Sequence, residues 1–267
     1  QYDIMIDRPL PLAPRELRWP VRERMNVAGD PLIELDEESV RAVIPLIEKY
    51  HIEALAVGLL HAYANPAHEE RVREIVKSAF PDLPVSISSE VCPEIREYER
   101  QSTTCANAYV QPKMAAYLTA LDARLRDMGF DCPFLLMTSG GGLTTLGNAI
   151  CFPIRLVESG PAGGAILAAE VAGEAGLDRV VSYDMGGTTA KICLIDDGQP
   201  LSTRTFEVAR AYRNLKGSGL PVRIPAIEMV EIGAGGGSLA HVDGMGRLEV
   251  GPESAGSHPG PACYDLG

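Results

Sequence analysis

The sequence predicts an α/β fold, because helical and strand patterns alternate along its first half. Apolar residues recur at helical spacing after Asp36. Glu53–Leu60 is a short, almost wholly apolar run, of the kind that is buried in a parallel sheet. The chain has 267 residues, of which 46% are hydrophobic, so it can form one large domain or two small ones with a proper core.

The elements of the first half can be placed from capping residues and prolines. Asp36 is a suitable N-cap for the first helix, and Pro45 is expected to kink that helix. The pair Asn65–Pro66 predicts the start of a second helix, which ends near Phe80. Pro84–Ser88 then supplies a second strand.

The second half begins with a long predicted helix from Ser102 to Met128, which we interpret as the joint between two lobes. A strand over residues 133–138 and a helix over residues 161–175 follow. Two strands, residues 179–183 and 191–195, come next and are separated by a glycine-rich turn.

Composition narrows the range of partners and compartments. The net charge is −12, which argues against a nucleic-acid surface and against binding to an anionic membrane. Six scattered cysteines without a Cys-x-x-Cys pair indicate reduced thiols, so we expect a cytoplasmic protein. The longest apolar run is too short to span a bilayer. The first residue is not Met, and we expect the chain to be a fragment.

The most informative segment is the predicted hairpin over residues 180–195. Its first strand ends at Asp184, and Gly186–Gly187 turns the chain into the second strand. Glycines allow backbone N–H groups to converge on an anion, and the hydroxyls of Thr188 and Thr189 can add donors. Asp184 can hold a hydrated Mg²⁺ against phosphates. The alternative is a hairpin in which Met-Gly-Gly is only a tight turn.

A second glycine-rich loop contains Gly235, Gly236 and Gly237. It formally fits a dinucleotide fingerprint, but Asp243-Gly244 ends the segment before a helix can form, so we reject that interpretation. The loop either faces a substrate or nucleotide, or is a plain strand–turn–strand connection.

Beyond this loop, His241 and Asp243 are spaced i, i+2, which places them on the same face of a strand. They are candidates for a metal-binding or acid–base pair. The alternative is that both side chains make only structural hydrogen bonds.

Two consecutive segments of the chain resemble a known protein fold. A small-residue helix over residues 158–170, followed by strand–Asp-x-Gly-Gly-Thr–strand, resembles the ribonuclease H-like, actin-like ATPase fold of sugar kinases and heat-shock chaperone ATPases. Seven co-linear motifs are similar to those of the hydantoinase A/oxoprolinase family, from Asp36 onward. They are residues 96–100, 102–104, 107–110, 139–142, 158–164, 232–238 and 251–264.

The resemblance implies an incomplete two-lobed fragment with mixed sheets flanked by helices. Residues 1–98 would be the C-terminal part of the family's N-terminal lobe, and residues 99–267 the first part of the actin-like lobe that carries the phosphate hairpin. The family's earlier Asp-x-Gly-Gly-Thr loop and its adenine-side region have no counterpart here. An isolated fragment is therefore expected to be inactive.

The resemblance also implies ATP- and Mg²⁺-dependent chemistry. Family members phosphorylate an amide or ketone oxygen, and a hydantoinase B-type subunit completes the reaction. Asp184 would position Mg²⁺, the Gly186–Thr189 turn would bind phosphate, and the substrate would be a hydantoin, N-methylhydantoin or 5-oxoproline.

One departure opens an alternative. The family hairpin commonly ends Thr-x-Thr-Asp, whereas Lys191 stands in place of the acid here, which resembles the acetone- and acetophenone-type ketone carboxylases. Lys191 is a catalytic candidate that either pairs with a phosphate or points to solvent. A third possibility is a nucleotide-responsive interaction module with no substrate of its own.

Overall fold

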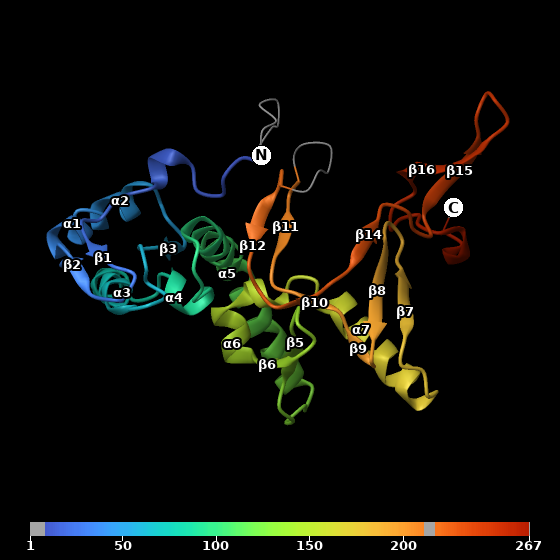
Figure 1. The fold of residues 1–267 in the computed structure, drawn as a ribbon, viewed down its shortest axis with the longest axis horizontal. Coiled ribbons are helices and arrows are strands. Elements are labelled where there is room, and N and C mark those ends of the chain that lie inside the picture. Colours follow the sequence, from blue (N-terminus) through green and yellow to red (C-terminus); the bar gives the residue numbers. More distant parts are fainter. Residues whose placement is uncertain (1–8, 211–216, 267) are drawn as a thin grey trace. The chain divides into compact units, whose positions relative to one another are not determined.

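The computed structural model describes residues 9–210 and 217–266, and the chain divides into two units. The first unit comprises residues 1–136, 143–157 and 204–225. The second unit comprises residues 137–142, 158–203 and 226–267. Helices and strands occur in both units, so the predicted α/β class is confirmed (Figure 1). The finer assignment to an actin-like fold, and the boundary at residue 98, stay predictions.

The first unit begins with short strands and helices around a parallel strand pair. Its elements up to the long helix are η1 (Arg15–Leu17), β1 (Arg24–Met25), β2 (Pro31–Ile33), α1 (Glu37–Arg41), α2 (Ile44–Lys49), β3 (Leu55–Val57), α3 (Ala67–Ala79), β4 (Val85–Ile87) and α4 (Ser88–Val91). β1 and β2 are antiparallel, and β3 and β4 are parallel with Leu55 opposite Val85. The prediction of a parallel strand over Glu53–Leu60 is thus confirmed for its central residues.

Local sequence signals explain these helices. The Asp36 carboxylate accepts the backbone N–H of Glu38 at 3.1 Å and caps α1. Pro45 lies in the first turn of α2, where the chain breaks from α1, as expected. The Asn65 side chain accepts the N–H of Ala67 at 3.0 Å at the start of α3. The apolar faces of these helices share one core with β3 and β4; its buried residues are Val40, Val43, Ile47, Val57, Val72, Ile75, Val76 and Ile87.

The long helix α5 (Glu97–Asp127) starts five residues before the predicted Ser102 and is followed by Gly129, which has φ 88°. Its first turns contain a buried arginine, Arg100, which explains why apolar periodicity did not reveal them. α5 contacts β3, β4, α4, α6 (Leu146–Cys151), η2 (Pro153–Leu156) and β12 (Leu220–Val222). β12 pairs with β11 (Phe206–Val208), and these elements form a second core around Ile154 and Val222.

The predicted strand over 133–138 is confirmed for its central residues as β5 (Leu135–Met137), which pairs with β6 (Leu143–Thr145). Among residues 9–210 and 217–266, no helix combines the length and the apolar character that crossing a bilayer requires.

The second unit consists of one helix and mainly antiparallel strands. Its elements are α7 (Ser159–Glu174), β7 (Val180–Met185), β8 (Ala190–Asp196), β9 (Gln199–Pro200), β10 (Ser202–Thr203), β13 (Ala226–Ile227), β14 (Val230–Ile232), β15 (Ser238–Val242), β16 (Leu248–Ser254) and η3 (Ala262–Tyr264). The main sheet has the order β14-β8-β7, and β9 pairs with the far end of β8. The predicted hairpin over residues 180–195 is confirmed.

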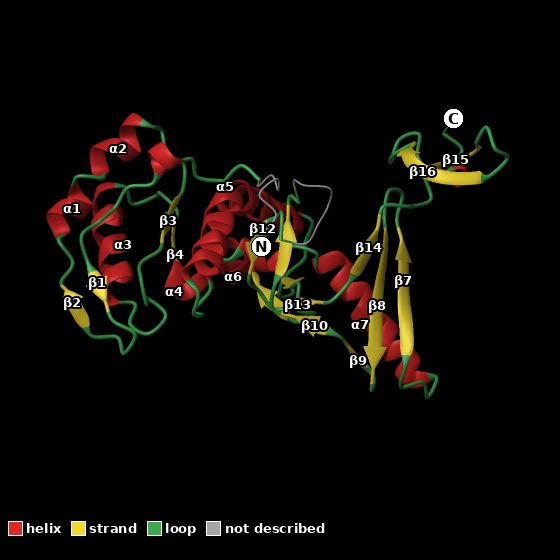
Figure 2. Cartoon of the chain, turned by 45° about the horizontal axis from the view of Figure 1, so that its top comes forward, coloured by secondary structure: helices red, strands yellow, loops and turns green. Residues whose placement is uncertain are grey.

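α7 lies along this sheet (Figure 2) and packs on it through small side chains. Ala162 and Ala165 are buried against Cys193 of β8, so the small-residue sequence of the helix allows a close approach. The other face of the sheet carries large apolar side chains that are 42% exposed or more: Val181, Tyr183, Met185, Leu194, Val230 and Ile232.

We predict that Arg100→Met destabilises the protein by about 3 kcal/mol, because it removes buried donors and leaves the carbonyl groups of Leu59 and Glu94 without their partners. Arg124→Met, at an exposed position of the same helix, is the control and is expected to change stability by less than about 0.5 kcal/mol. Urea denaturation of both variants measures the difference. Equal stability of the two would show that the buried network contributes nothing.

Candidate functional site

The candidate site is the turn between β7 and β8. Asp184 and Lys191 lie directly opposite each other in the two strands, and the N–H of Gly186 donates to the carbonyl of Thr189 at 2.9 Å. The turn is therefore a closed hairpin, in agreement with the sequence. Asp184 and Thr188 are exposed at this end of the sheet.

The second glycine loop holds this turn by direct backbone contact. The N–H of Gly236 donates to the carbonyl of Gly186 at 2.9 Å, and the N–H of Gly237 donates to that of Gly187 at 2.8 Å. A Cβ on Gly235 would lie 2.7 Å from the carbonyl oxygens of Gly186 and Gly187, a distance that real Cβ atoms do not tolerate. We call this contact between residues 186–187 and 235–237 the glycine lock.

A third segment closes the glycine lock from the other side. The N–H of Ala255 donates to the carbonyl of Gly237 at 2.7 Å, and a Cβ on Gly237 would lie 2.8 Å from the carbonyl oxygen of Gly256. Steric crowding by the backbone therefore explains why glycine occupies positions 235 and 237, without reference to any ligand. This finding favours a structural role for the loop over direct contact with a nucleotide.

The glycine lock leaves a definite set of donors. Within the described part of the chain, the N–H groups of Gly187, Thr188 and Thr189 have no hydrogen-bond acceptor, whereas those of Gly186 and the second loop are occupied. The Asp184 carboxylate likewise has no hydrogen bond or ion pair to a described residue. Three free N–H groups and a free carboxylate therefore lie along one short turn.

This arrangement fits a magnesium–phosphate ligand. Free N–H groups suit phosphate oxygens, while a carboxylate beside them would repel phosphate unless a cation lies between. Among the described residues there is no group of three or more His, Cys, Asp or Glu arranged to hold a metal ion. Mg²⁺ does not need such a cluster, because it usually keeps several waters and binds one or two carboxylates together with substrate phosphates.

Lys191 is paired with acidic side chains and does not point to solvent, while its pairing with a phosphate stays a prediction. Its ammonium group contacts the carboxylate of Glu158, the residue preceding α7, and lies 3.8 Å from Glu231 of β14. The side chain is only 18% exposed. Glu231 and Asp184 are both cross-strand neighbours of Lys191, so this lysine is surrounded by acidic groups. The pairing of Lys191 with Glu158 and Glu231 could not be predicted from the sequence, since both contacts depend on long-range folding.

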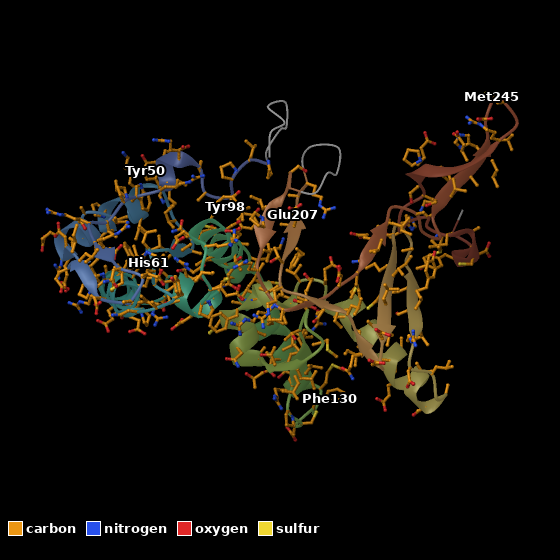
Figure 3. The ribbon with its side chains drawn as sticks, viewed as in Figure 1. Tyr50, His61, Tyr98, Phe130, Glu207 and Met245 are labelled. Carbon is orange, nitrogen blue, oxygen red and sulfur yellow. The ribbon has the colours of Figure 1, made fainter. Side chains whose placement is uncertain are left out.

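His241 and Asp243 lie on the hairpin of β15 and β16, whose turn carries Met245 (Figure 3). Asp243 organises that turn: it accepts the N–H groups of Met245 and Arg247 at 2.8 Å and the Arg247 guanidinium at 2.7 Å. The backbone N–H and the guanidinium of Arg247 lower the pKa of Asp243. His241 lies opposite Glu249, with its Nε2 at 3.5 Å from that carboxylate. A joint role of His241 and Asp243 stays a prediction.

Comparison with known proteins shows which family the chain belongs to. A family sequence model described as hydantoinase/oxoprolinase matches residues 100–267, and one for the N-terminal region of the same family matches residues 1–80. The chain belongs to the hydantoinase/oxoprolinase family.

The chain is similar to subunits of differently named enzymes in this family. The chain is 36% identical to the caprolactamase subunit alpha of Pseudomonas jessenii over 100% of its own length and 37% of the relative. It is 37% identical to the acetophenone carboxylase gamma subunit of Aromatoleum aromaticum, over 98% of its length and 35% of the relative. The crystal structure of the ATP-dependent caprolactamase from Pseudomonas jessenii matches the whole chain with a TM-score of 0.76 at 34% identity, and the chain covers 37% of it. The chain thus spans little more than a third of these relatives.

We predict that Gly235→Ala displaces the turn of residues 186–187 and destabilises the protein by about 1–3 kcal/mol, because its methyl group meets backbone atoms. Gly233→Ala, where nothing lies within 4 Å, is the matched control and is expected to be neutral within about 0.5 kcal/mol. Denaturation midpoints measure both. Equal midpoints would argue against the glycine lock.

Proposed function

We propose that this chain is the phosphate-binding part of an ATP-dependent enzyme subunit that activates a cyclic amide for hydrolysis. The single observation that carries the proposal is the turn after Asp184, where three free N–H groups lie beside a free carboxylate. The relatives support the reaction class, since caprolactamase acts on a lactam and its solved structure is described as ATP-dependent. Because the chain spans 37% of the caprolactamase subunit, its activity, substrate and partners are all part of the proposal.

Each residue of the turn has a definite task in this proposal. The N–H groups of Gly187, Thr188 and Thr189 would hold the terminal phosphate oxygens, and Asp184 would bind Mg²⁺. Bound ATP would supply the phosphoryl group that activates the amide oxygen. Gly235, Gly236 and Gly237 would keep the turn in place through the glycine lock, without touching the nucleotide themselves.

Lys191 would act by charge. In the structure, the Lys191 ammonium group pairs with the carboxylate of Glu158. Lys191 lies in β8, the strand that follows the turn. A lysine near the bound phosphates would compensate part of the charge that develops during phosphoryl transfer. Its pairing with Glu158 would set how much of that positive charge reaches the phosphates.

The second candidate is the activating subunit of a ketone carboxylase. Lys191 in place of the family's acid, and the 37% identity to the acetophenone carboxylase gamma subunit, favour it. The two activities are separated by ATP turnover with a lactam, on the one hand, and with a ketone and bicarbonate, on the other. In either case we propose a hydantoinase B-type subunit as partner, because the named relatives are themselves subunits. We propose the cytoplasm as location, because the six cysteines are free thiols.

We predict that Asp184→Asn weakens the binding of a magnesium complex of a non-hydrolysable ATP analogue by at least about tenfold, which is about 1.4 kcal/mol. The amide keeps the size of the side chain and removes the charge that attracts Mg²⁺. Asp196→Asn, at the other end of β8 and 62% exposed, is the matched control and is expected to bind normally. Calorimetry on the full-length protein measures both affinities.

Removal of Mg²⁺ with EDTA should reduce the affinity of the unmodified protein to that of the Asp184→Asn variant, and should leave the variant unchanged. An Asp184→Asn protein with undiminished affinity and an intact response to Mg²⁺ would exclude Asp184 as the magnesium residue.

A further inference from the structure

A second group of polar side chains lies at the carboxyl ends of the parallel strands β3 and β4, within the first unit. β3 ends at Val57 and continues through Leu59 to His61, while β4 runs directly into α4 at Ser88. Ligands of open α/β sheets bind at the carboxyl ends of the strands. This edge of the sheet is therefore a place to search for a site.

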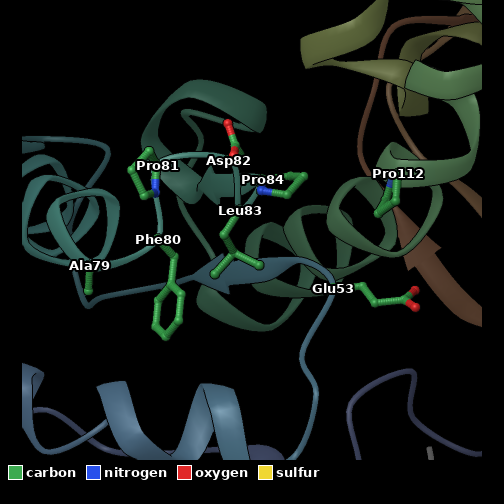
Figure 4. Close-up of a pocket in the computed structure, with 8 residues that line it drawn as sticks. All are labelled: Glu53, Ala79, Phe80, Pro81, Asp82, Leu83, Pro84 and Pro112. Carbon is green, nitrogen blue, oxygen red and sulfur yellow. The ribbon is translucent and has the colours of Figure 1, made fainter.

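The amino ends of the same strands offer less. An open hollow of about 650 Å³ lies there, lined in part by Glu53, Phe80, Asp82 and Leu83 (Figure 4). Among the described residues, the carboxylates of Glu53 and Asp82 have no hydrogen-bond or ion-pair partner. The carboxyl ends are different, because there the polar groups contact one another.

The base of this group contains three fully buried side chains, those of Glu69, Ser88 and Arg100. Arg100 donates to the carbonyl of Leu59 at 3.0 Å, to the carbonyl of Glu94 at 2.8 Å and to the hydroxyl of Ser88 at 3.1 Å. The buried Glu69 accepts the N–H of Leu59 at 2.8 Å and the hydroxyl of Ser88 at 2.6 Å. Leu59 is thus held through both its N–H and its carbonyl group, two residues before His61. Such a network orients the residues above it.

His61 (Figure 3) follows Leu59 by two residues, and one of its ring nitrogens, Nδ1, contacts neighbouring polar groups. Its Nδ1 lies 3.4 Å from the hydroxyl of Tyr63 and 3.9 Å from Oε1 of Glu97, and Glu97 in turn lies 3.5 Å from the Arg100 guanidinium. Partial burial acts to raise the pKa of Glu97, but its own backbone N–H, Arg100 and His61 lower it overall. An ionised carboxylate on this side favours the tautomer with the proton on Nδ1.

The other ring nitrogen is available. Nε2 has no partner within the described part of the chain, and the His61 side chain is 25% exposed. With the proton on Nδ1, Nε2 is a hydrogen-bond acceptor. The nearby charge of Glu97 disfavours an anionic ligand, so phosphate and carboxylate groups are poor partners for this position. A neutral molecule that presents an N–H donor fits it.

The backbone conformation does not by itself distinguish this group. His61 has φ 55° and Arg96, directly before Glu97, has φ 78°, but the exposed His51 has φ 51° as well. Non-glycine residues in this region are uncommon.

We propose that His61 is a binding residue for a neutral small molecule of the amide class, whose N–H group donates to Nε2, with Glu97 as the residue that positions the imidazole. The choice of an amide, and with it of an N–H donor, rests on the proposed function, whereas the requirement for a hydrogen-bond donor comes from the geometry.

The test compares lactams with their N-methyl counterparts. In the full-length protein without nucleotide, 2-pyrrolidinone and ε-caprolactam should bind about 5- to 10-fold more tightly than N-methyl-2-pyrrolidinone and N-methylcaprolactam, the effect of one neutral hydrogen bond. His61→Asn should abolish this preference, because asparagine tolerates the left-handed backbone but lacks Nε2. His51→Asn, exposed and at φ 51°, is the matched control and should keep it. Titrations followed by NMR measure the affinities.

Equal affinity for the N–H and N-methyl compounds, absence of binding by either lactam, or a preference that survives in His61→Asn would overturn the inference. The comparison in the unmodified protein needs no variant, so a misfolded His61→Asn protein does not prevent the test. Nucleotide binding measured on the same sample separates the two proposals. A protein that binds Mg–ATP without an N–H preference contradicts this inference alone, and one with the preference but without nucleotide binding contradicts the proposed function alone.

Discussion

The candidate site depends on the glycine lock, the backbone contact between residues 186–187 and 235–237. Two carbonyl groups of the β7–β8 turn accept N–H groups from the second loop, and a side chain at Gly235 or Gly237 would prevent this approach. Because the carbonyl groups are occupied, the turn is fixed from one side. Its remaining N–H groups are left free, which is the arrangement that an anion requires.

The strands beside the turn also determine which charged groups lie near it. Asp184 is free and exposed, whereas Lys191, opposite to it, is paired with Glu158 and lies near Glu231. A free carboxylate beside free N–H groups suits a ligand that brings both a metal ion and phosphates. The group around His61 has the opposite preference, because its free nitrogen is an acceptor next to an acid. The two proposed sites would therefore select chemically different ligands, a nucleotide and a neutral molecule.

Local features of the fold could be predicted from the sequence, and long-range ones could not. The cap at Asp36, the break at Pro45 and the hairpin around Asp184 each depend on residues close in the chain, and all three are confirmed. The contact of Gly236 with Gly186 joins residues far apart, so the sequence showed two glycine-rich loops but not that one supports the other. The early start of α5 was missed because Arg100, a charged residue, is buried there.

The most direct test of the central claim is amide hydrogen exchange of the full-length protein with and without the magnesium complex of a non-hydrolysable ATP analogue. The account predicts that Gly187, Thr188 and Thr189 exchange rapidly without the ligand and slowly with it, while Gly236 and Gly237 are protected in both states. Bound nucleotide that leaves exchange at residues 187–189 unchanged would contradict the claim that this turn holds the phosphates.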